Sequence, residues 1–138
     1  MPVRWNLTPQ FNAMKDKAER GVREIAEFIE IDAQLRILNP PKTGRVYSGA
    51  PYRIGKPPHQ ASAPGESPAD DTGTLRNSSK VTKRGRLKYE VKFTAAYAAD
   101  LEYGNLNKNI EPRPFMRPAI MEGVKNVKRI MELGINRK

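Results

Sequence analysis

The sequence predicts an α+β fold, in which a small antiparallel sheet is packed by a long N-terminal helix and a C-terminal helix. Three patterns lead to this prediction. Apolar residues near the N-terminus recur at steps of three and four, residues 87–93 alternate between apolar and polar, and a second helical stripe follows Pro118. Because the order is helix, strands, helix, we expect helices on one face of the sheet. The 138 residues are predicted to form a single domain (1–138).

The first helix is predicted to begin at Thr8-Pro9, a capping residue followed by proline at the first helical position. One apolar stripe contains Phe11, Met14, Ala18, Val22, Ile25 and Ile29, and an offset second stripe contains Phe28, Ile31, Leu35 and Leu38. A helix through Asn39 is about 45 Å long, whereas a compact chain of this size has a radius of gyration of about 14 Å. The favoured interpretation is a helix that projects towards a neighbouring molecule, and the alternative is a bend near Gly21.

Residues 40–71 are rich in proline, glycine and serine, and they are predicted to form an extended loop. Within it, Val46-Tyr47 and Tyr52-Arg53-Ile54 are expected to pair as a small hairpin. Loops this long inside a compact domain are usually functional or disordered. We therefore expect an assembly loop, mobile in the free subunit and ordered against a partner, with a plain disordered insertion as the alternative.

A short turn over residues 74–78, with Leu75 pointing inward, precedes the predicted sheet. The alternation of Leu87, Tyr89, Val91 and Phe93 with polar residues predicts a strand with one buried face. Its antiparallel partner is expected around residues 79–82, joined by a turn at residues 83–86.

The segment from Tyr97 to Ala119 is predicted to contain a short helix that Gly104 ends. Prolines 112, 114 and 118 are expected to keep Arg113 and Arg117 out of helical conformation. Pro118 then begins a final helix that runs to Leu133 and is closed by Gly134. Its predicted apolar stripe is Ile120, Val124, Val127 and Met131.

The composition restricts the chemistry that the chain can support. There is no cysteine and one histidine, His59, so we expect no catalytic residue, no metal site and no cofactor. A nuclease built from Glu90, Lys92 and an upstream aspartate is a weak alternative, because both side chains lie on the solvent side of the strand. Neither a membrane span nor a secretion signal is expected, and the chain is expected to be synthesised in the cytoplasm.

The net charge of +10 indicates contact with an anionic partner. A basic patch of DNA- or partner-facing residues is predicted on the hairpin: Lys80, Lys83, Arg84, Arg86, Lys88 and Lys92. Tyr89 and Phe93 point to the other face, so base stacking is not supported and DNA contact would be independent of sequence.

Three ordered blocks carry a resemblance to a known family. Tyr97-Ala98, Glu102-Tyr103-Gly104 and Arg113-Pro114-Phe115 with Arg117-Pro118-Ala119 form the last block, Thr72-Gly73-Thr74-Leu75-Arg76 the middle one, and residues 42–47 the first. Together they resemble the tail-completion and head–tail joining (neck) proteins of long-tailed, double-stranded DNA bacteriophages. The chain departs from that pattern at Ser79, where an apolar residue is commoner, and at Asn105, where threonine often follows the glycine.

This resemblance implies a structural virion protein and not an enzyme. Such subunits form rings, often of six, at the connector between head and tail, around the channel through which DNA leaves. It implies a homo-oligomer whose partners are other phage neck and tail proteins and the passing double-stranded DNA, made in the host bacterial cytoplasm and located in the virion. The alternative is a sequence-independent DNA-binding protein that acts as a monomer or dimer.

The motif residues are expected to have structural roles: Thr72, Gly73, Leu75, Arg76, Tyr97, Ala98, Glu102, Tyr103, Gly104, Arg113, Pro114, Phe115, Arg117 and Pro118. Glu102 lies among apolar neighbours and is expected to pair with a cation from Arg76, Arg113 or Arg117. The alternative is an exposed Glu102. Phe115 is expected to insert into the core or into a neighbouring subunit.

Overall fold

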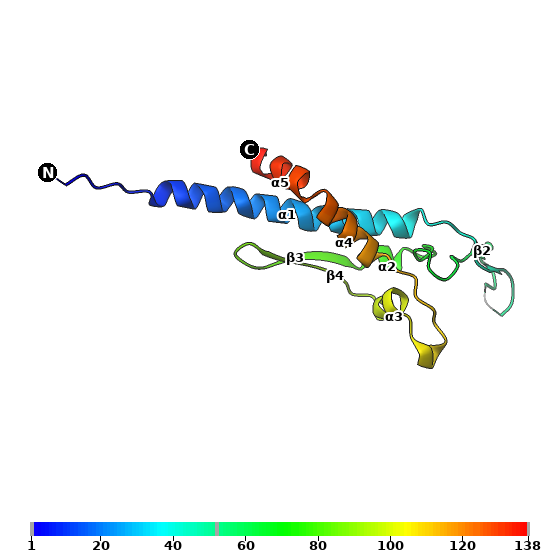
Figure 1. The fold of residues 1–138 in the computed structure, drawn as a ribbon. Coiled ribbons are helices and arrows are strands. Elements are labelled where there is room, and N and C mark those ends of the chain that lie inside the picture. The colour runs from blue at the N-terminus through cyan, green and yellow to red at the C-terminus, as the bar shows by residue number, and fades with distance from the viewer. Residues whose placement is uncertain (1, 52, 138) are drawn as a thin grey trace.

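A computed structural model describes residues 2–51 and 53–137 and shows the predicted α+β fold, with two small antiparallel two-stranded sheets. Helix α1 (Thr8–Leu38) runs along the whole molecule. Helices α4 (Met116–Lys125) and α5 (Val127–Asn136) pack on one side of α1, and the hairpin of β3 (Ser79–Gly85) and β4 (Lys88–Phe93) packs on the other (Figure 1). The remaining elements are β1 (Val46–Tyr47), β2 (His59–Gln60), α2 (Thr74–Asn77), α3 (Ala98–Tyr103) and the 3-10 helix η1 (Leu106–Lys108).

Helix α1 is continuous, so the alternative of a bend at Gly21 is wrong. Gly21 is instead a packing position, because a Cβ placed there would lie 3.1 Å from the Met131 side chain of α5. The first turns of α1 extend beyond both α5 and the tip of the hairpin (Figure 1). No helix in the described part of the chain has the length and apolar character needed to cross a bilayer.

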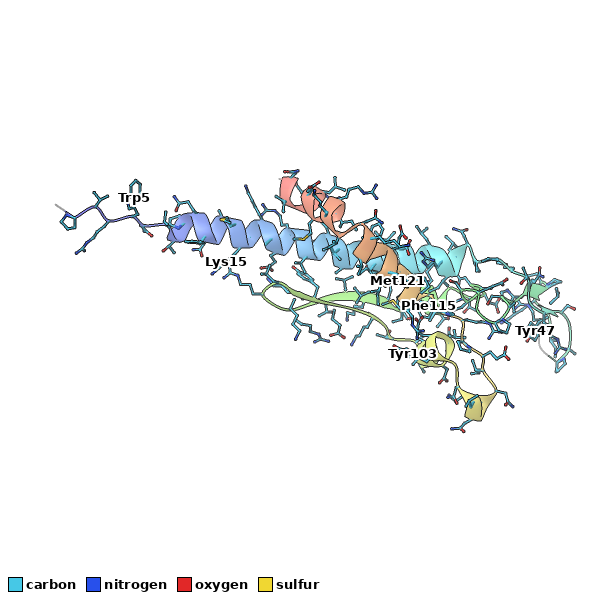
Figure 2. All side chains as sticks on the ribbon, in the orientation of Figure 1. Trp5, Lys15, Tyr47, Tyr103, Phe115 and Met121 are labelled. Carbon is cyan, nitrogen blue, oxygen red and sulfur yellow. The ribbon has the colours of Figure 1, made fainter. Side chains whose placement is uncertain are left out.

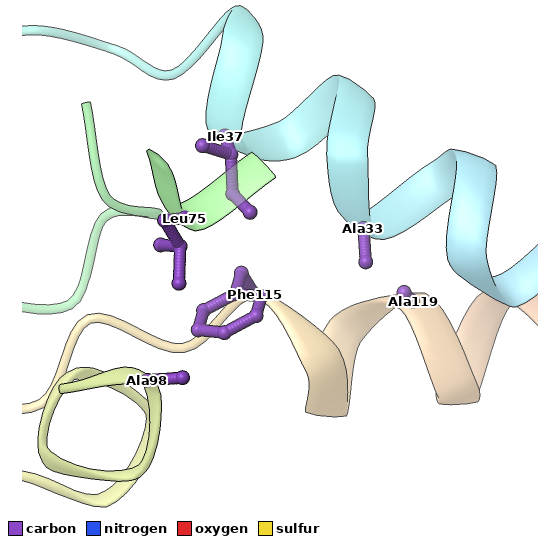
Figure 3. Packing of buried hydrophobic residues seen from close by; sticks show 6 residues of the cluster. All are labelled: Ala33, Ile37, Leu75, Ala98, Phe115 and Ala119. Carbon is purple, nitrogen blue, oxygen red and sulfur yellow. The ribbon is translucent and has the colours of Figure 1, made fainter. Parts of the chain in front are cut away.

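The hydrophobic core lies where α1 meets the short helices α2 and α3 and the start of α4 (Figure 3). Phe115 is 1% exposed, and its ring meets that of Phe93 edge-on, with centroids 5.0 Å apart. The rest of the buried cluster comprises Ala33, Ile37, Leu75, Ala98 and Ala119. Phe115 therefore inserts into the core of its own chain, and the inward position of Leu75 is confirmed.

The C-terminal region differs from the prediction of one helix. It forms two helices that break at Asn126, whose side-chain amide donates to the Glu122 backbone and carboxylate, both at 2.9 Å. The closest contacts with α1 are made at the small residues Ala119, Gly123 and Gly134. Of the predicted stripe, Met131 packs against Gly21 of α1, whereas Ile120, Val124 and Val127 are exposed. Small residues occupy these contact points because the helices approach each other too closely there for larger side chains.

The ends of these helices also differ from prediction. Helix α4 begins at Met116, two residues before Pro118, which makes Arg117 helical and not extended. Proline is tolerated there because the first turn of a helix does not use its own N–H groups. Gly134 lies inside α5 and does not end it.

The predicted antiparallel hairpin is confirmed, with Val81 opposite Val91 and Ser79 opposite Phe93. The turn is tighter than predicted, because β3 continues to Gly85. Leu87, expected in the buried face, is an exposed turn residue with φ of 55°. Leu87 belongs to the turn, so the alternation of the strand starts only at Lys88.

The loop at 40–71 is only partly free of the domain. Val46–Tyr47 pairs with His59–Gln60 and not with the predicted segment, of which Tyr52 lies outside the described residues. The last part of the loop is attached: Gly65 N–H donates to Pro112 O at 2.9 Å, and Ser67 Oγ to Pro114 O at 3.0 Å. Residues 45–51 and 53–60 lie at one end of the molecule, beyond the C-terminal end of α1 (Figure 1).

The close contact between α5 and α1 generates a stability prediction. A Cβ on Gly134 would lie 2.8 Å from Arg20 O and from Gly21 Cα, which are backbone atoms. We expect Gly134→Ala to lower the free energy of unfolding by about 1–3 kcal/mol, measured by urea denaturation. Gly21→Ala is the control with a smaller expected loss, because a flexible methionine can move away. Equal losses would contradict this account.

Candidate functional site

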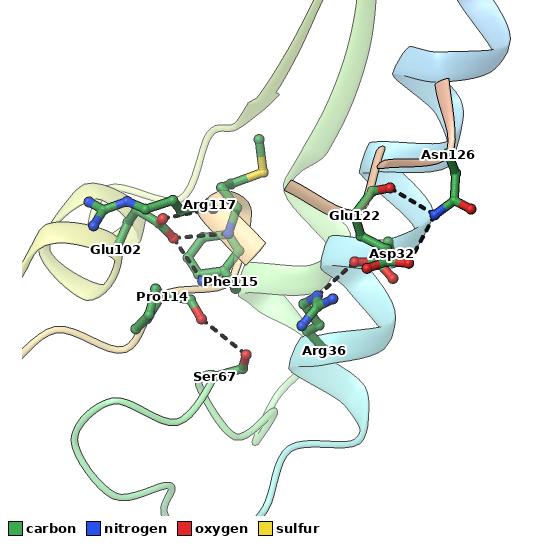
Figure 4. A network of polar contacts seen from close by, with 10 residues as sticks. Asp32, Arg36, Ser67, Glu102, Pro114, Phe115, Arg117, Glu122 and Asn126 are labelled. Atoms are coloured by element: carbon green, nitrogen blue, oxygen red, sulfur yellow. Dashed lines mark hydrogen bonds and ion pairs between the residues drawn. The ribbon is translucent and has the colours of Figure 1, made fainter. Parts of the chain in front are cut away.

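The buried carboxylate of Glu102 joins helix α3 to helix α4. Glu102, at the end of α3, is 6% exposed. Its carboxylate accepts hydrogen bonds from the backbone N–H groups of Phe115 (2.8 Å), Met116 (2.9 Å) and Arg117 (2.9 Å) (Figure 4). These are the first N–H groups of α4, which have no partner inside the helix. Glu102 therefore caps α4 from a different helix, and its negative charge is stabilised by the positive end of the helix dipole.

This contact corrects the prediction that Glu102 pairs with an arginine side chain, and also its alternative of exposure. Arg76 Nε lies 3.4 Å from Asp70, and Arg113 Nε donates to Ser62 O at 3.3 Å. The Arg117 guanidinium lies 5.8 Å from the centre of the Tyr103 ring. A buried carboxylate needs oriented donors, and three backbone N–H groups supply them without the cost of burying a second charge.

The other motif residues shape the turns around this cap. Gly104 has φ of 77°, and a Cβ there would lie 2.9 Å from Pro112 and 3.0 Å from Ile110 O. The chain returns alongside α3, where Arg113 N–H donates to Leu101 O at 2.6 Å. Gly104 thus allows the segment after η1 to lie against α3, as the cap requires.

The middle motif block builds the entry to α2. Gly73 has φ of 78°, and its N–H donates to Asp70 Oδ1 at 2.8 Å. The hydroxyl groups of Thr72 and Thr74 are 2.8 Å apart. Tyr97, the residue before α3, is exposed, whereas Ala98 is buried.

Two carboxylates hold the loop. Glu66 accepts from the Ala63 N–H at 2.8 Å and from the Thr43 hydroxyl, and the Thr43 hydrogen bond lowers the pKa of Glu66. Asp71 accepts from Arg53 at 2.7 Å, and this hydrogen bond lowers the pKa of Asp71. His59 Nδ1 lies 3.8 Å from Asp71. Sequence reasoning did not identify these pairs, because their members are distant in the sequence.

The residues of the predicted basic patch lie on two different faces of the β3–β4 hairpin. Lys83 forms an ion pair with Glu19 of α1, which raises the pKa of Lys83, and Arg86 lies 4.0 Å from Asp16. The other face carries Lys80 directly opposite Lys92. Arg84 pairs with Glu90 on that face, and Lys88 is exposed at its end. The patch therefore splits because Lys83 shares the α1-facing side of the sheet with Tyr89.

The solvent-accessible surface is large for the size of the chain and includes many large apolar side chains. The solvent-accessible area is 9734 Å², whereas a globular monomer of this mass exposes about 7,200 Å². Three groups of large apolar side chains are exposed: Val3, Trp5, Leu7, Phe11 and Met14; Ile31, Leu35 and Leu38; and Ile120, Met121, Val124 and Leu133. Contiguous apolar surface on a soluble protein marks an interaction site. The sequence signal that could have pointed to this exposed surface is the group of apolar residues before the first helix, Val3, Trp5 and Leu7.

Comparison with protein-family models, curated proteins and solved structures gives no match to this chain. Within residues 2–51 and 53–137, no three histidine, aspartate or glutamate side chains are grouped so as to hold a metal ion.

The cap on α4 generates a second prediction. Glu102→Gln replaces one acceptor oxygen by an amide that faces the N–H donors, so it should lower the free energy of unfolding by about 2 kcal/mol or more. Thermal or urea unfolding measures this loss. The exposed Glu132→Gln removes the same charge from α5 and should change stability by less than about 0.5 kcal/mol. If both variants unfold alike, the cap is not the stabilising feature.

Glu66 generates a prediction on pH. Because its pKa is lowered in the folded loop, its hydrogen bonds are fully formed above the ordinary carboxyl pKa and break as pH falls through the lower folded value. Amide hydrogen exchange at Ala63, corrected for intrinsic rates, should therefore accelerate below about pH 4. Glu66→Ala, which removes the acceptor, should exchange fast at every pH. Protection at Ala63 that persists to full acid unfolding would overturn the assignment.

Proposed function

We propose that this protein is a structural subunit of the head–tail interface of a long-tailed bacteriophage, which assembles as a ring around the DNA channel. The observation that carries the proposal is the set of large apolar side chains that stay exposed on a chain whose helix α1 projects beyond its own fold. A subunit that functions alone gains nothing from such a surface, whereas a subunit of an assembly buries it against neighbours.

The positions of the motif residues support the same proposal. Leu75 of the middle block and Ala98 and Phe115 of the last block meet in one cluster, and Glu102 caps the helix that Phe115 precedes. These residues build a framework that holds the projecting elements in place. A ring protein requires such a framework, because its function depends on presenting surfaces at fixed angles.

The outer face of the β3–β4 hairpin is proposed to meet DNA or an acidic neighbour. Lys80, Lys88 and Lys92 are exposed there, with Arg84 beside Glu90. The second candidate function, sequence-independent DNA binding by a monomer or dimer, rests on this same face. It ranks second because Lys83 and Arg86 face acids of α1. With fewer cations directed at phosphate groups, DNA binding is weaker and depends less on salt.

The experiment is deletion of this reading frame from the phage genome that carries it, followed by electron microscopy of the lysate. We expect DNA-filled heads and complete tails that are not joined. Wild-type protein supplied in trans should restore joined particles, and so should the control Leu106→Gln, which changes an exposed residue of η1. Joined, infectious particles from the deletion would overturn the proposal.

A further inference from the structure

Residues 44–51 and 53–61 form a finger at one end of the molecule, and the base of this finger is fixed to the rest of the chain (Figure 1). The two sides of the finger pair as β1 and β2. At the base, Gly44 N–H donates to Ala61 O at 3.0 Å. A Cβ on Gly44 would overlap the backbone of Ser62, so the two sides approach each other too closely there for any side chain.

One side chain organises the tip of the finger. Arg53 N–H donates to Gly49 O at 2.6 Å, and Arg53 Nε donates to Pro57 O at 2.5 Å. The same guanidinium also reaches outside the finger, because its Nη1 donates to Asp71 Oδ2 at 2.7 Å. The Arg53 side chain is only 11% exposed, although its neighbour Ile54 lies at the surface. Arg53 therefore both shapes the tip and joins it to the body of the protein.

The position of the acceptor, Asp71, is fixed by the residue before it. Asp70 Oδ1 accepts from the Gly73 N–H at 2.8 Å, and Asp70 N–H donates to Ile37 O, in the last turn of α1, at 3.2 Å. Asp71 therefore projects from a segment that is bonded to both α1 and the start of α2. A second finger residue approaches the same carboxylate, because His59 Nδ1 lies 3.8 Å from Asp71 Oδ1.

The finger also covers a cavity at the surface of the body. Tyr47 of β1, labelled in Figure 2, lines a space of about 260 Å³ whose other walls include Pro68, Leu101 and Arg113. A space of this size holds several water molecules at about 30 Å³ each. Since side chains do not fill the space between Tyr47 and the body, dispersion contacts contribute little there to holding the finger in place. The ion pair at the tip gains importance accordingly.

We infer that the finger is a lid, and that the Arg53–Asp71 ion pair keeps this lid closed. When the pair breaks, the tip separates from the body while the base at Gly44 stays in place, and Tyr47 moves away from the cavity. Asp71 is 40% exposed, so salt screens the pair and a higher ionic strength favours the open lid. The inference goes beyond the proposed function, because it concerns the single subunit. It assigns the mobility expected of the 40–71 loop to one part of that loop.

The test measures the distance between the finger and the body. The natural chain has no cysteine, so Ile54→Cys at the tip and Met121→Cys on α4 provide two exposed positions for spin labels. Double electron–electron resonance at low salt should give one main distance. Asp71→Asn should add a second, broader distance population, and the fraction of open molecules should rise by about threefold or more. Arg53→Gln should have the same effect, and so should high salt on the unsubstituted pair.

Two controls separate this ion pair from a general loss of structure. Asp100→Asn breaks an ion pair with Lys108, 2.6 Å long, that joins α3 to η1, and it should leave the distances unchanged. Arg53→Gln added to Asp71→Asn should open the lid little further, because both substitutions remove one interaction. A broad distribution at low salt in the labelled chain without further substitution, an unchanged distribution in Asp71→Asn, or equal broadening in Asp100→Asn would each overturn the inference.

Discussion

The fold depends most on the carboxylate of Glu102 at the start of α4. Phe115 directly precedes this helix, and its side chain offers no hydrogen-bond acceptor, yet its N–H is buried. Leaving such groups without partners is costly in a protein interior. Because the acceptor comes from α3, the bond that completes α4 also sets the distance between the two helices. Phe115 is thereby held between Leu75, Ala98 and Ile37 (Figure 3).

Around this point the chain packs through small residues and turns its large apolar residues outward. Ala119, Gly123 and Gly134 contact α1, while Ile120, Met121 and Val124 remain at the surface. Each close helix contact contributes dispersion energy but little apolar burial. The subunit therefore has a modest core for its length, and much of its apolar surface is left for contacts with other molecules.

The sequence predicted those features that arise from local periodicity. The α+β class, the long first helix and the hairpin follow from steps of three and four or of two, whereas the insertion of Phe115 was expected from the motif around it. The partner of Glu102 was not predictable, because backbone N–H groups have no sequence signature and every residue except proline carries one. The apolar stripe after Pro118 misled the helix prediction, because helices that cross at glycine and alanine invert the usual inward pattern. The pairing of β1 with β2 was not predictable either, because no short sequence motif marks the connection between these two strands.

Gly21 and Gly134 are where α5 stops along α1, since backbone meets backbone there. From that point to Thr8, α1 has about 20 Å of length free of α5. The close contact between these two glycines thus determines how far α1 extends beyond α5. A bulkier pair would shift the crossing of α5 on α1 and so change how far the first turns of α1 extend beyond α5.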